Sequence, residues 1–166
     1  VWEGAMVASM QGVMRDNPDA YFLDIGGNIG TFTLSMAAMG RETYTVEPFP
    51  QNYRLICGSV NRNRFHDVTH IFKVAATSKP RDLSIVLPDP GNKGSAYVTE
   101  RGYSDTPGTT TVHARGVPLD LLSTYLPKGK PVVLKLDVEG SELQVLEGGQ
   151  EFMKVQNVIY LQVELR

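Results

Sequence analysis

The sequence predicts an α/β protein whose sheet is mainly parallel and carries helices on both faces. Three observations support this prediction. Strand-like and helix-like patterns alternate from residue 20 to 77 and again from residue 131 to the end, as in right-handed β-α-β units. The apolar run at 20–26 shows no alternation, as expected for a strand buried on both faces. A glycine-rich turn follows that run, so the expected arrangement is a doubly wound, Rossmann-like sheet.

The first half of the chain is predicted to form three helices and three strands. Residues 2–14 place apolar side chains at positions 2, 5, 6, 10, 13 and 14, which is helical spacing. A strand at 20–26 leads into a helix at 31–39 that Gly40 ends. The remaining elements are expected at 43–48 (strand), 50–63 (helix) and 68–77 (strand).

The pattern then changes and later resumes. An inserted β excursion is expected at about residues 83–115, with short strands at 82–90, 95–100 and 109–115. Beyond it come a helix from about Pro118, a strand at 131–140, a helix at 141–155 and a strand at 157–165. We expect a single domain over residues 1–166, divided into 1–19 (N-terminal helix), 20–77 (first half), 78–115 (excursion) and 116–166 (incomplete second half).

Composition argues against several classes of protein. The 166 residues suit one domain. A net charge of −2 and a pI near 5.9 give no case for binding nucleic acid or a membrane surface. The single cysteine, Cys57, rules out an intramolecular disulfide and a Cys-based zinc site. Without a secretory signal or a long apolar run we expect a cytoplasmic protein. Because the chain starts on Val1 and ends on Arg166 within a predicted strand, we expect a fragment truncated at its C-terminus.

The turn after the first strand, Asp24-Ile25-Gly26-Gly27-Asn28-Ile29-Gly30, indicates a ligand site. A buried acid needs hydrogen-bond donors, and glycines let the backbone approach a ligand closely. No register supplies the G-x-G-x-x-G of a dinucleotide site, and no P-loop lysine follows. An acid two residues before the first glycine suits an ammonium group and repels a diphosphate. The pattern therefore favours S-adenosylmethionine, which carries an amino acid group and no phosphate.

Glu47 ends the second strand about 20 residues after the glycines. An acid at this point can accept hydrogen bonds from both ribose hydroxyls of an adenosine. Nicotinamide and S-adenosylmethionine cofactors would both use it, so it does not separate them. The structural alternative is that Asp24 and Glu47 only cap the helices that follow them.

Three segments resemble the class I S-adenosylmethionine-dependent methyltransferases, and more closely the FkbM-type family. They are "FLDIGGNIGTFTL", "VEPFPQNY" and "VVLKLDVEGSELQVLEGG". The last segment, residues 132–149, is the most specific, and the resemblance extends from Tyr21 to the end of the chain. It implies an S-adenosylmethionine-dependent methyltransferase that acts on the hydroxyl group of a small molecule or sugar.

The resemblance also implies a set of cofactor-binding residues. On the methionine side these are Asp24, Gly26 and Gly30, with Gly27 and Asn28 in the same loop. On the adenosine side they are Glu47 for the ribose, Pro48 and Phe49 beside the adenine, and Ala75 and Ala76 flanking the base. The chain departs from the family pattern at one point. No acid that could pair with the adenine amino group follows the third strand closely, since the next one is Asp82.

The fourth strand supplies the candidate catalytic residues. A period of two places Lys135, Asp137 and Glu139 on one face. Methyl transfer to a hydroxyl needs alignment and often a base, so Asp137 is the first candidate for a base or an orienting group and Glu139 the second. Lys135 is expected either to act at the site or to form a buried ion pair with an acid. Magnesium at Asp137 and Glu139 and a base at His113 are weaker alternatives, and no metal site is assigned.

Two other functions remain open at this point. The domain could hold an adenosine ligand without turnover, or it could be an NAD-dependent oxidoreductase, which the glycine spacing disfavours. The expected partner is a small-molecule methyl acceptor, with no nucleic acid or membrane partner.

Overall fold

A computed structural model describes residues 3–87, 97–99 and 110–164. Its main sheet has five strands, and every neighbouring pair is parallel. The order across the sheet is β3 (Thr69–Phe72), β2 (Thr43–Val46), β1 (Tyr21–Ile25), β8 (Pro131–Leu136) and β9 (Asn157–Val163). The chain order reverses between β1 and β8. Ligands of such sheets bind at this switch point, beyond the carboxyl ends of the strands.

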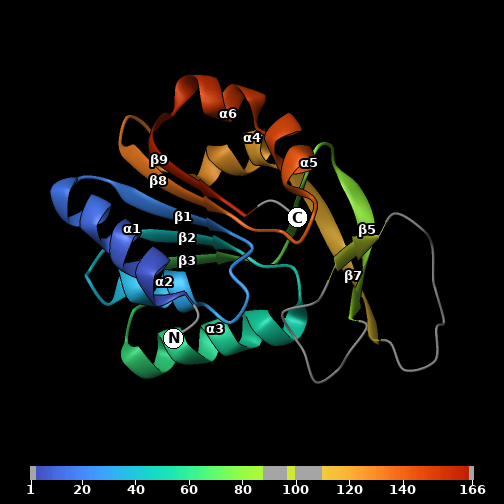
Figure 1. The fold of residues 1–166 in the computed structure, drawn as a ribbon. Coiled ribbons are helices and arrows are strands. Elements are labelled where there is room, and N and C mark those ends of the chain that lie inside the picture. The colour runs from blue at the N-terminus through green and yellow to red at the C-terminus, as the bar shows by residue number, and fades with distance from the viewer. Residues whose placement is uncertain (1–2, 88–96, 100–109, 165–166) are drawn as a thin grey trace.

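Helices cover both faces of this sheet (Figure 1). One face carries α1 (Gly4–Asp16), α2 (Thr31–Ala37) and α3 (Pro50–Asn63). The other carries α4 (Leu119–Leu122), α5 (Glu142–Glu147) and α6 (Gln150–Val155). The predicted doubly wound, Rossmann-like fold is therefore confirmed.

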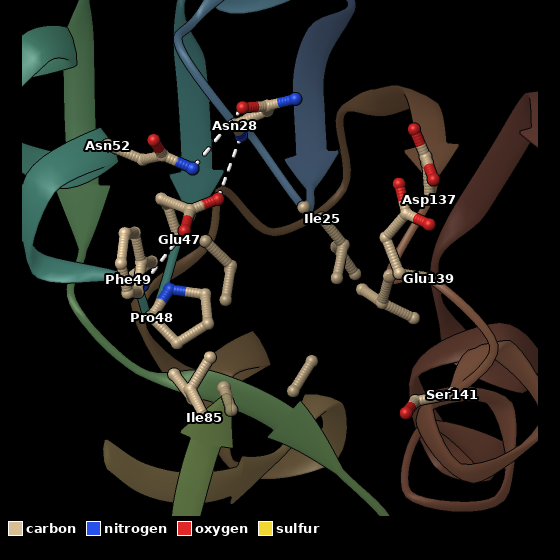
Figure 2. A pocket seen from close by; sticks show the side chains of 15 residues that line it. Ile25, Asn28, Glu47, Pro48, Phe49, Asn52, Ile85, Asp137, Glu139 and Ser141 are labelled. Carbon is tan, nitrogen blue, oxygen red and sulfur yellow. Dashed lines mark hydrogen bonds between the residues drawn. The ribbon is translucent and has the colours of Figure 1, made fainter. Parts of the chain in front are cut away.

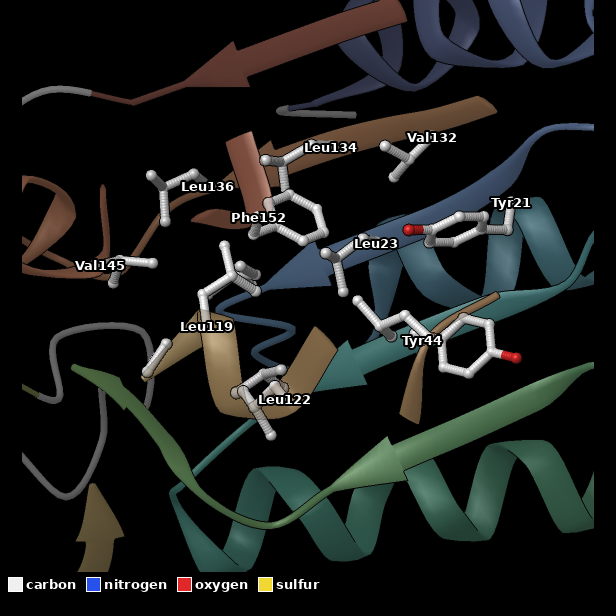
Figure 3. Close-up of a cluster of buried hydrophobic side chains, with 14 residues drawn as sticks. Tyr21, Leu23, Tyr44, Leu119, Leu122, Val132, Leu134, Leu136, Val145 and Phe152 are labelled. Atoms are coloured by element: carbon white, nitrogen blue, oxygen red, sulfur yellow. The ribbon is translucent and has the colours of Figure 1, made fainter. Parts of the chain in front are cut away.

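Strand β1 is buried on both faces, which explains its unbroken apolar run. Tyr21, Leu23 and Ile25 point into one core, shown in Figure 3, where Leu119 and Phe152 pack from the helices. Phe22 points into the opposite core, below α1 and α2. Asp24 shares the face of Phe22 by the two-residue period of a strand, so its carboxyl group points toward α2.

A second, four-stranded sheet lies beside the first. Its order is β4 (Ala75–Thr77), β7 (Thr110–Pro118), β5 (Arg81–Leu87) and β6 (Tyr97–Thr99). Only β4 and β7 are parallel. The predicted excursion is thus a sheet whose described strands run from residue 75 to 118, wider than the predicted 78–115. Parts of the predicted strands 82–90, 95–100 and 109–115 lie outside the described residues.

The predicted strand at 68–77 is wrong as a single element. It forms β3 and β4, which belong to different sheets, with Lys73 and Val74 between them. Ala75 to Thr77 pair with β7, while β3 pairs with β2. No glycine or proline separates the two segments, and local composition does not reveal a change of partner strand.

The predicted helix at 141–155 is also two helices, α5 and α6, which break at Gly148 and Gly149. A Cβ atom on Gly148 would lie 2.0 Å from the carbonyl oxygen of Thr77. The glycine therefore lets α5 pack directly against β4. The helix predicted from Pro118 is short: α4 passes into one 3-10 turn at Ser123–Tyr125.

Candidate functional site

A cleft opens at the carboxyl ends of β1, β2 and β8 (Figure 2). It encloses about 650 Å³ of space, which includes the part open to solvent. The lining residues are Ile25, Gly26, Asn28, Val46, Glu47, Pro48, Phe49, Asn52, Ala75, Ala76, Ile85, Asp137, Val138, Glu139 and Ser141.

The glycine turn after β1 brings two loops into backbone contact. Gly26 has a φ of 88°, and a Cβ atom there would lie 1.7 Å from the carbonyl oxygen of Asp137. Only glycine satisfies both the positive φ and the close approach. The Asp137 N–H donates to the Ile25 carbonyl at 3.0 Å, which continues the pairing of β1 with β8 into the cleft. The end of β8 is therefore fixed against the glycine turn.

Glu47 forms one side of the cleft and is almost fully buried. One carboxylate oxygen accepts a hydrogen bond from the Asn28 N–H and the other from the Phe49 N–H, both at 2.8 Å (Figure 2). Burial raises the pKa of Glu47 to about 7, although these two donors act in the opposite direction. A ligand hydroxyl that donates to this carboxylate would favour its ionised form.

Asp137, Glu139 and Ser141 lie across the cleft from Glu47 (Figure 2). The loop that carries them turns sharply, since Glu139 has a φ of 56° and Gly140 a φ of 96°. Glu142 fixes this loop: its Oε1 accepts hydrogen bonds from the N–H groups of Val138 at 3.0 Å and Gly140 at 3.1 Å. These two hydrogen bonds hold the loop against the first turn of α5.

Lys135 lies directly behind the cleft wall. Its ammonium nitrogen is 3.5 Å from Asp24 Oδ1 and 3.4 Å from Asp137 Oδ2, and it donates to the Gly26 carbonyl at 3.0 Å. Burial alone would lower the pKa of Lys135, but the neighbouring Asp24 and Asp137 raise it above the ordinary value. The buried ion pair considered from the sequence is therefore present, and it involves both acids.

Most of the predicted site residues line the cleft, namely Gly26, Asn28, Glu47, Pro48, Phe49, Ala75, Ala76, Asp137 and Glu139. Three do not: Asp24, Gly27 and Gly30. Asp24 is fully buried and accepts a 2.6 Å hydrogen bond from the Thr33 hydroxyl. It does not border the cleft itself, but it lies 3.5 Å from Lys135 and interacts electrostatically with Glu47. Gly27 supports the turn from behind, where a Cβ atom would lie 2.4 Å from Thr45 Cγ2.

The sequence reasoning missed Asn52 and Ile85 among the lining residues. Asn52 donates to the Asn28 side chain at 3.2 Å. It shares the buried face of α3 with Ile56 and Val60, and a polar residue on an apolar face was the signal for it. Ile85 comes from β5 of the second sheet and packs against Phe49. Nothing in its local sequence indicates this contact.

The two weaker alternatives gain no support from the positions of these side chains. His113 is an exposed residue of β7 and does not line the cleft. Among residues 3–87, 97–99 and 110–164, no three His, Cys, Asp or Glu side chains gather as a metal site.

No helix in the same part of the chain has the length and apolar character to cross a bilayer.

The sequence and the fold were compared with those of known proteins. The family model of the methyltransferase FkbM domain matches residues 24–166. The structure of methyltransferase FkbM from Methylobacillus flagellatus KT is similar with a TM-score of 0.52 and 17% identity over 80% of this chain. The chain spans only 30% of the length of that protein.

A further solved structure, P. horikoshii TYW2 in complex with MeSAdo, has a TM-score of 0.34 and 12% identity. That match covers 60% of this chain and 56% of the other. No curated protein matches the sequence. The family match spans the glycine turn, both strand-end acids and the loop after β8. The chain belongs to the FkbM methyltransferase family.

Proposed function

We propose that this chain binds S-adenosylmethionine in the cleft and transfers its methyl group to a hydroxyl of a small molecule or sugar. One observation carries the proposal: the described lining contains the carboxyl groups of Glu47, Asp137 and Glu139 and no lysine or arginine. A diphosphate cofactor such as NAD requires cationic or backbone N–H partners for its phosphates, and three acids would repel it. A positively charged cofactor without phosphate fits the same surface.

The residues at the Glu47 side suit the adenosine part of the cofactor. The Glu47 carboxylate would accept hydrogen bonds from the ribose hydroxyls. Apolar side chains of Phe49, Ala76 and Ile85 are buried around the cleft and would pack against the adenine ring. Asn28 and Asn52, already joined by a hydrogen bond, offer further polar groups beside the ribose.

The residues at the Asp137 side suit the reacting end. Asp137 Oδ1 is buried and has no hydrogen-bond donor within the described residues, so a ligand group would satisfy it. When bound, the cofactor supplies a methyl group on a positively charged sulfur. Asp137 would orient the acceptor hydroxyl and take up its proton, a role usually worth about 10²–10⁴-fold in rate. Glu139 is the second candidate for this role.

Binding and transfer assays test the proposal in two steps. S-adenosylhomocysteine should bind in a calorimetric titration while NAD does not, and the reverse result would favour an oxidoreductase. The Asp137→Ala variant should then lose at least about a hundredfold of methyl transfer while keeping cofactor binding within about tenfold. Asp67→Ala, an exposed acid before β3, is the matched control and should transfer normally. Unchanged transfer by Asp137→Ala would contradict the role given to Asp137.

A domain that binds an adenosine ligand without turnover is the second candidate. The observation that favours it is that the chain spans 30% of the M. flagellatus FkbM methyltransferase. In that case S-adenosylhomocysteine binds, and no hydroxylated acceptor is methylated by the wild-type chain.

A further inference from the structure

Three charged side chains meet in the wall between β1 and β8. Asp24 is fully buried, Lys135 is 5% exposed, and the Asp137 side chain is 18% exposed. Lys135 lies almost midway between the acids, at 3.5 Å from Asp24 and 3.4 Å from Asp137. We refer to these three side chains as the Asp24–Lys135–Asp137 cluster. Charges so little exposed are weakly screened by salt.

The cluster contains more acid than base. Because the two acids raise the pKa of Lys135, its amine stays protonated at neutral pH, and it can balance one of them. Two buried oxygens, Asp24 Oδ1 and Asp137 Oδ1, accept no hydrogen bond from the described residues. The second of these belongs to a residue that lines the cleft. Asp137 borders both the cleft and a small hollow beside it, so its unmet acceptor lies in the wall that separates the two.

Nearby groups from other elements do not cancel this surplus. Glu3, ahead of α1, and Glu164, after β9, line a small hollow together with Lys135 and Asp137. Glu47, after β2, also interacts electrostatically with Asp24 and Lys135. All three of these groups are acidic. The cation–π contact of Lys135 with Phe32, 5.1 Å from nitrogen to ring centroid, adds no formal charge.

We propose that the Asp24–Lys135–Asp137 cluster makes the cleft favour the positively charged methyl donor over the neutral product. This inference rests on the proposed function, since it concerns the same cofactor. Methyl transfer removes one methyl group and one positive charge from the sulfur, which is left as a thioether. The acceptor oxygen gains the methyl and gives its proton to Asp137, which passes it on to solvent and is ionised again. A surplus negative charge in a poorly screened wall attracts only the donor. Product release is thereby favoured by the loss of charge.

The test measures the dissociation constant of S-adenosylhomocysteine divided by that of S-adenosylmethionine. A high ratio means that the cleft prefers the charged donor. Both should be measured by calorimetry at about pH 8, where Glu47 is ionised in the free protein as well. Asp24→Asn keeps the shape of the side chain and its bond with Thr33 but removes one charge. We expect the ratio to fall about tenfold, because the variant loses one unit of negative charge that attracts the sulfonium through a partly buried wall.

Three further variants separate the effect of charge from the effect of packing. Asp24→Asn combined with Lys135→Met leaves Asp137 alone, which restores a surplus of one negative charge, so the ratio should recover toward the wild-type value. Glu42→Gln removes a charge at the amino end of β2, away from the cleft, and should leave the ratio unchanged. Asp137→Asn, in the more exposed member of the cluster, should repeat the effect of Asp24→Asn and replaces it if that variant does not fold.

The outcomes separate this inference from the proposed function. Failure of the wild-type chain to bind either ligand would overturn both. Binding of both ligands, with the same ratio in wild type, Asp24→Asn and Asp137→Asn, would overturn only the role of the cluster. A ratio that falls in the single variants and stays low in the double variant would also contradict it, because packing instead of charge would then be responsible.

Discussion

The Glu47 carboxyl group combines deep burial with two backbone donors, and its ionisation is therefore sensitive to a ligand. Its pKa of about 7 lies above the ordinary value of 4.5. Between these two values the folded, ligand-free chain holds a proton that the unfolded chain has lost. This group alone therefore makes the ligand-free fold less stable as pH rises from 4.5 to about 7.

Cofactor affinity should change with pH in the opposite direction. If the ribose hydroxyls donate to the ionised carboxylate, binding below about pH 7 must displace a proton. The affinity for S-adenosylhomocysteine should then rise up to about tenfold per pH unit below the pKa and level off above it. Titrations at about pH 5.5, 6.5 and 8 measure this. The Glu47→Gln variant should bind more weakly and without the pH dependence, and a flat profile in the wild type would contradict the contact.

Single residues were predictable where position along a strand determines their surroundings. Glu47 follows the end of β2 and Asp137 the end of β8, and both line the cleft. The predicted strand at 131–140 is too long, since β8 ends at Leu136 and leaves Asp137 and Glu139 in a loop. Asp24 lies within β1, one residue before its end, and the alternation of the strand turns its side chain toward Thr33. The sequence indicated an acid near a ligand but not the face on which it lies.

Gly148, at the break between α5 and α6, makes a contact with β4 that only glycine permits. Gly148→Ala would place a methyl group 2.0 Å from the Thr77 carbonyl oxygen and 2.9 Å from Ser78 Cα. Both neighbours are backbone atoms, so α5 must move away from β4. We expect the free energy of unfolding to fall by about 2 kcal/mol, measured by urea denaturation.

Gly58→Ala is the matched control for that substitution. Gly58 lies on the exposed side of α3, and its Cβ would meet no atom within 4 Å. The variant should gain up to about 1 kcal/mol from helix propensity. Equal effects of the two substitutions would show that the contact with β4 is unimportant.

The second sheet contributes to the cleft through Ile85 on β5. Ile85 packs with Phe49, Val112 and Ala114 and is almost fully buried. Ile85→Ala should weaken cofactor binding by about tenfold, since about two methylene groups of contact are lost. Val86→Ala, on the opposite face of the same strand, should lose a similar amount of stability but leave the dissociation constant unchanged. Calorimetric titration and thermal unfolding of both variants measure the difference.

Elements were predictable where a single pattern spans them, and less so where tertiary contacts divide them. Helix α3 follows its apolar period over its full predicted length, residues 50–63. The segment 68–77 contains no turn residue, and its division into β3 and β4 depends on pairing with β7, more than 30 residues later. The pair Gly148 and Gly149 was a local signal for the break in the last helix, but its reason lies in the distant Thr77.

The whole molecule joins its two halves at the cleft. The glycine turn and the end of β8 touch through Gly26 and Asp137, and Lys135 bonds to both. A ligand that contacts the ends of β1, β2 and β8 should stabilise the entire sheet. S-adenosylhomocysteine at about 100 times its dissociation constant should add about 2.7 kcal/mol. For a domain of this size, the melting temperature would rise by about 8 °C, as measured by differential scanning fluorimetry.

Two controls accompany that measurement. NAD at the same concentration should give no shift, and Glu47→Gln should give a smaller one with S-adenosylhomocysteine. An equal shift with both ligands would favour a general nucleotide site.

At this scale the sequence predicted most of the fold because alternation and burial agree along the main sheet. The parallel direction of the strands follows from the apolar runs that alternate with helices. The same runs account for the burial of Tyr21 and Phe22 in the cores on the two faces of β1. The second sheet was recognised only as an excursion. Its role as part of the cleft wall depends on how two sheets lie against each other, which no local pattern specifies.

The left-handed backbone at Glu139 has a consequence for engineering this protein. A φ of 56° costs a residue with a side chain about 1 kcal/mol relative to glycine. Glu139→Gly should therefore resist heat better than the natural chain, by a few degrees at its midpoint. If the same variant also transfers methyl groups more slowly in the assay of the proposed function, the strained backbone at Glu139 lowers stability but supports that activity.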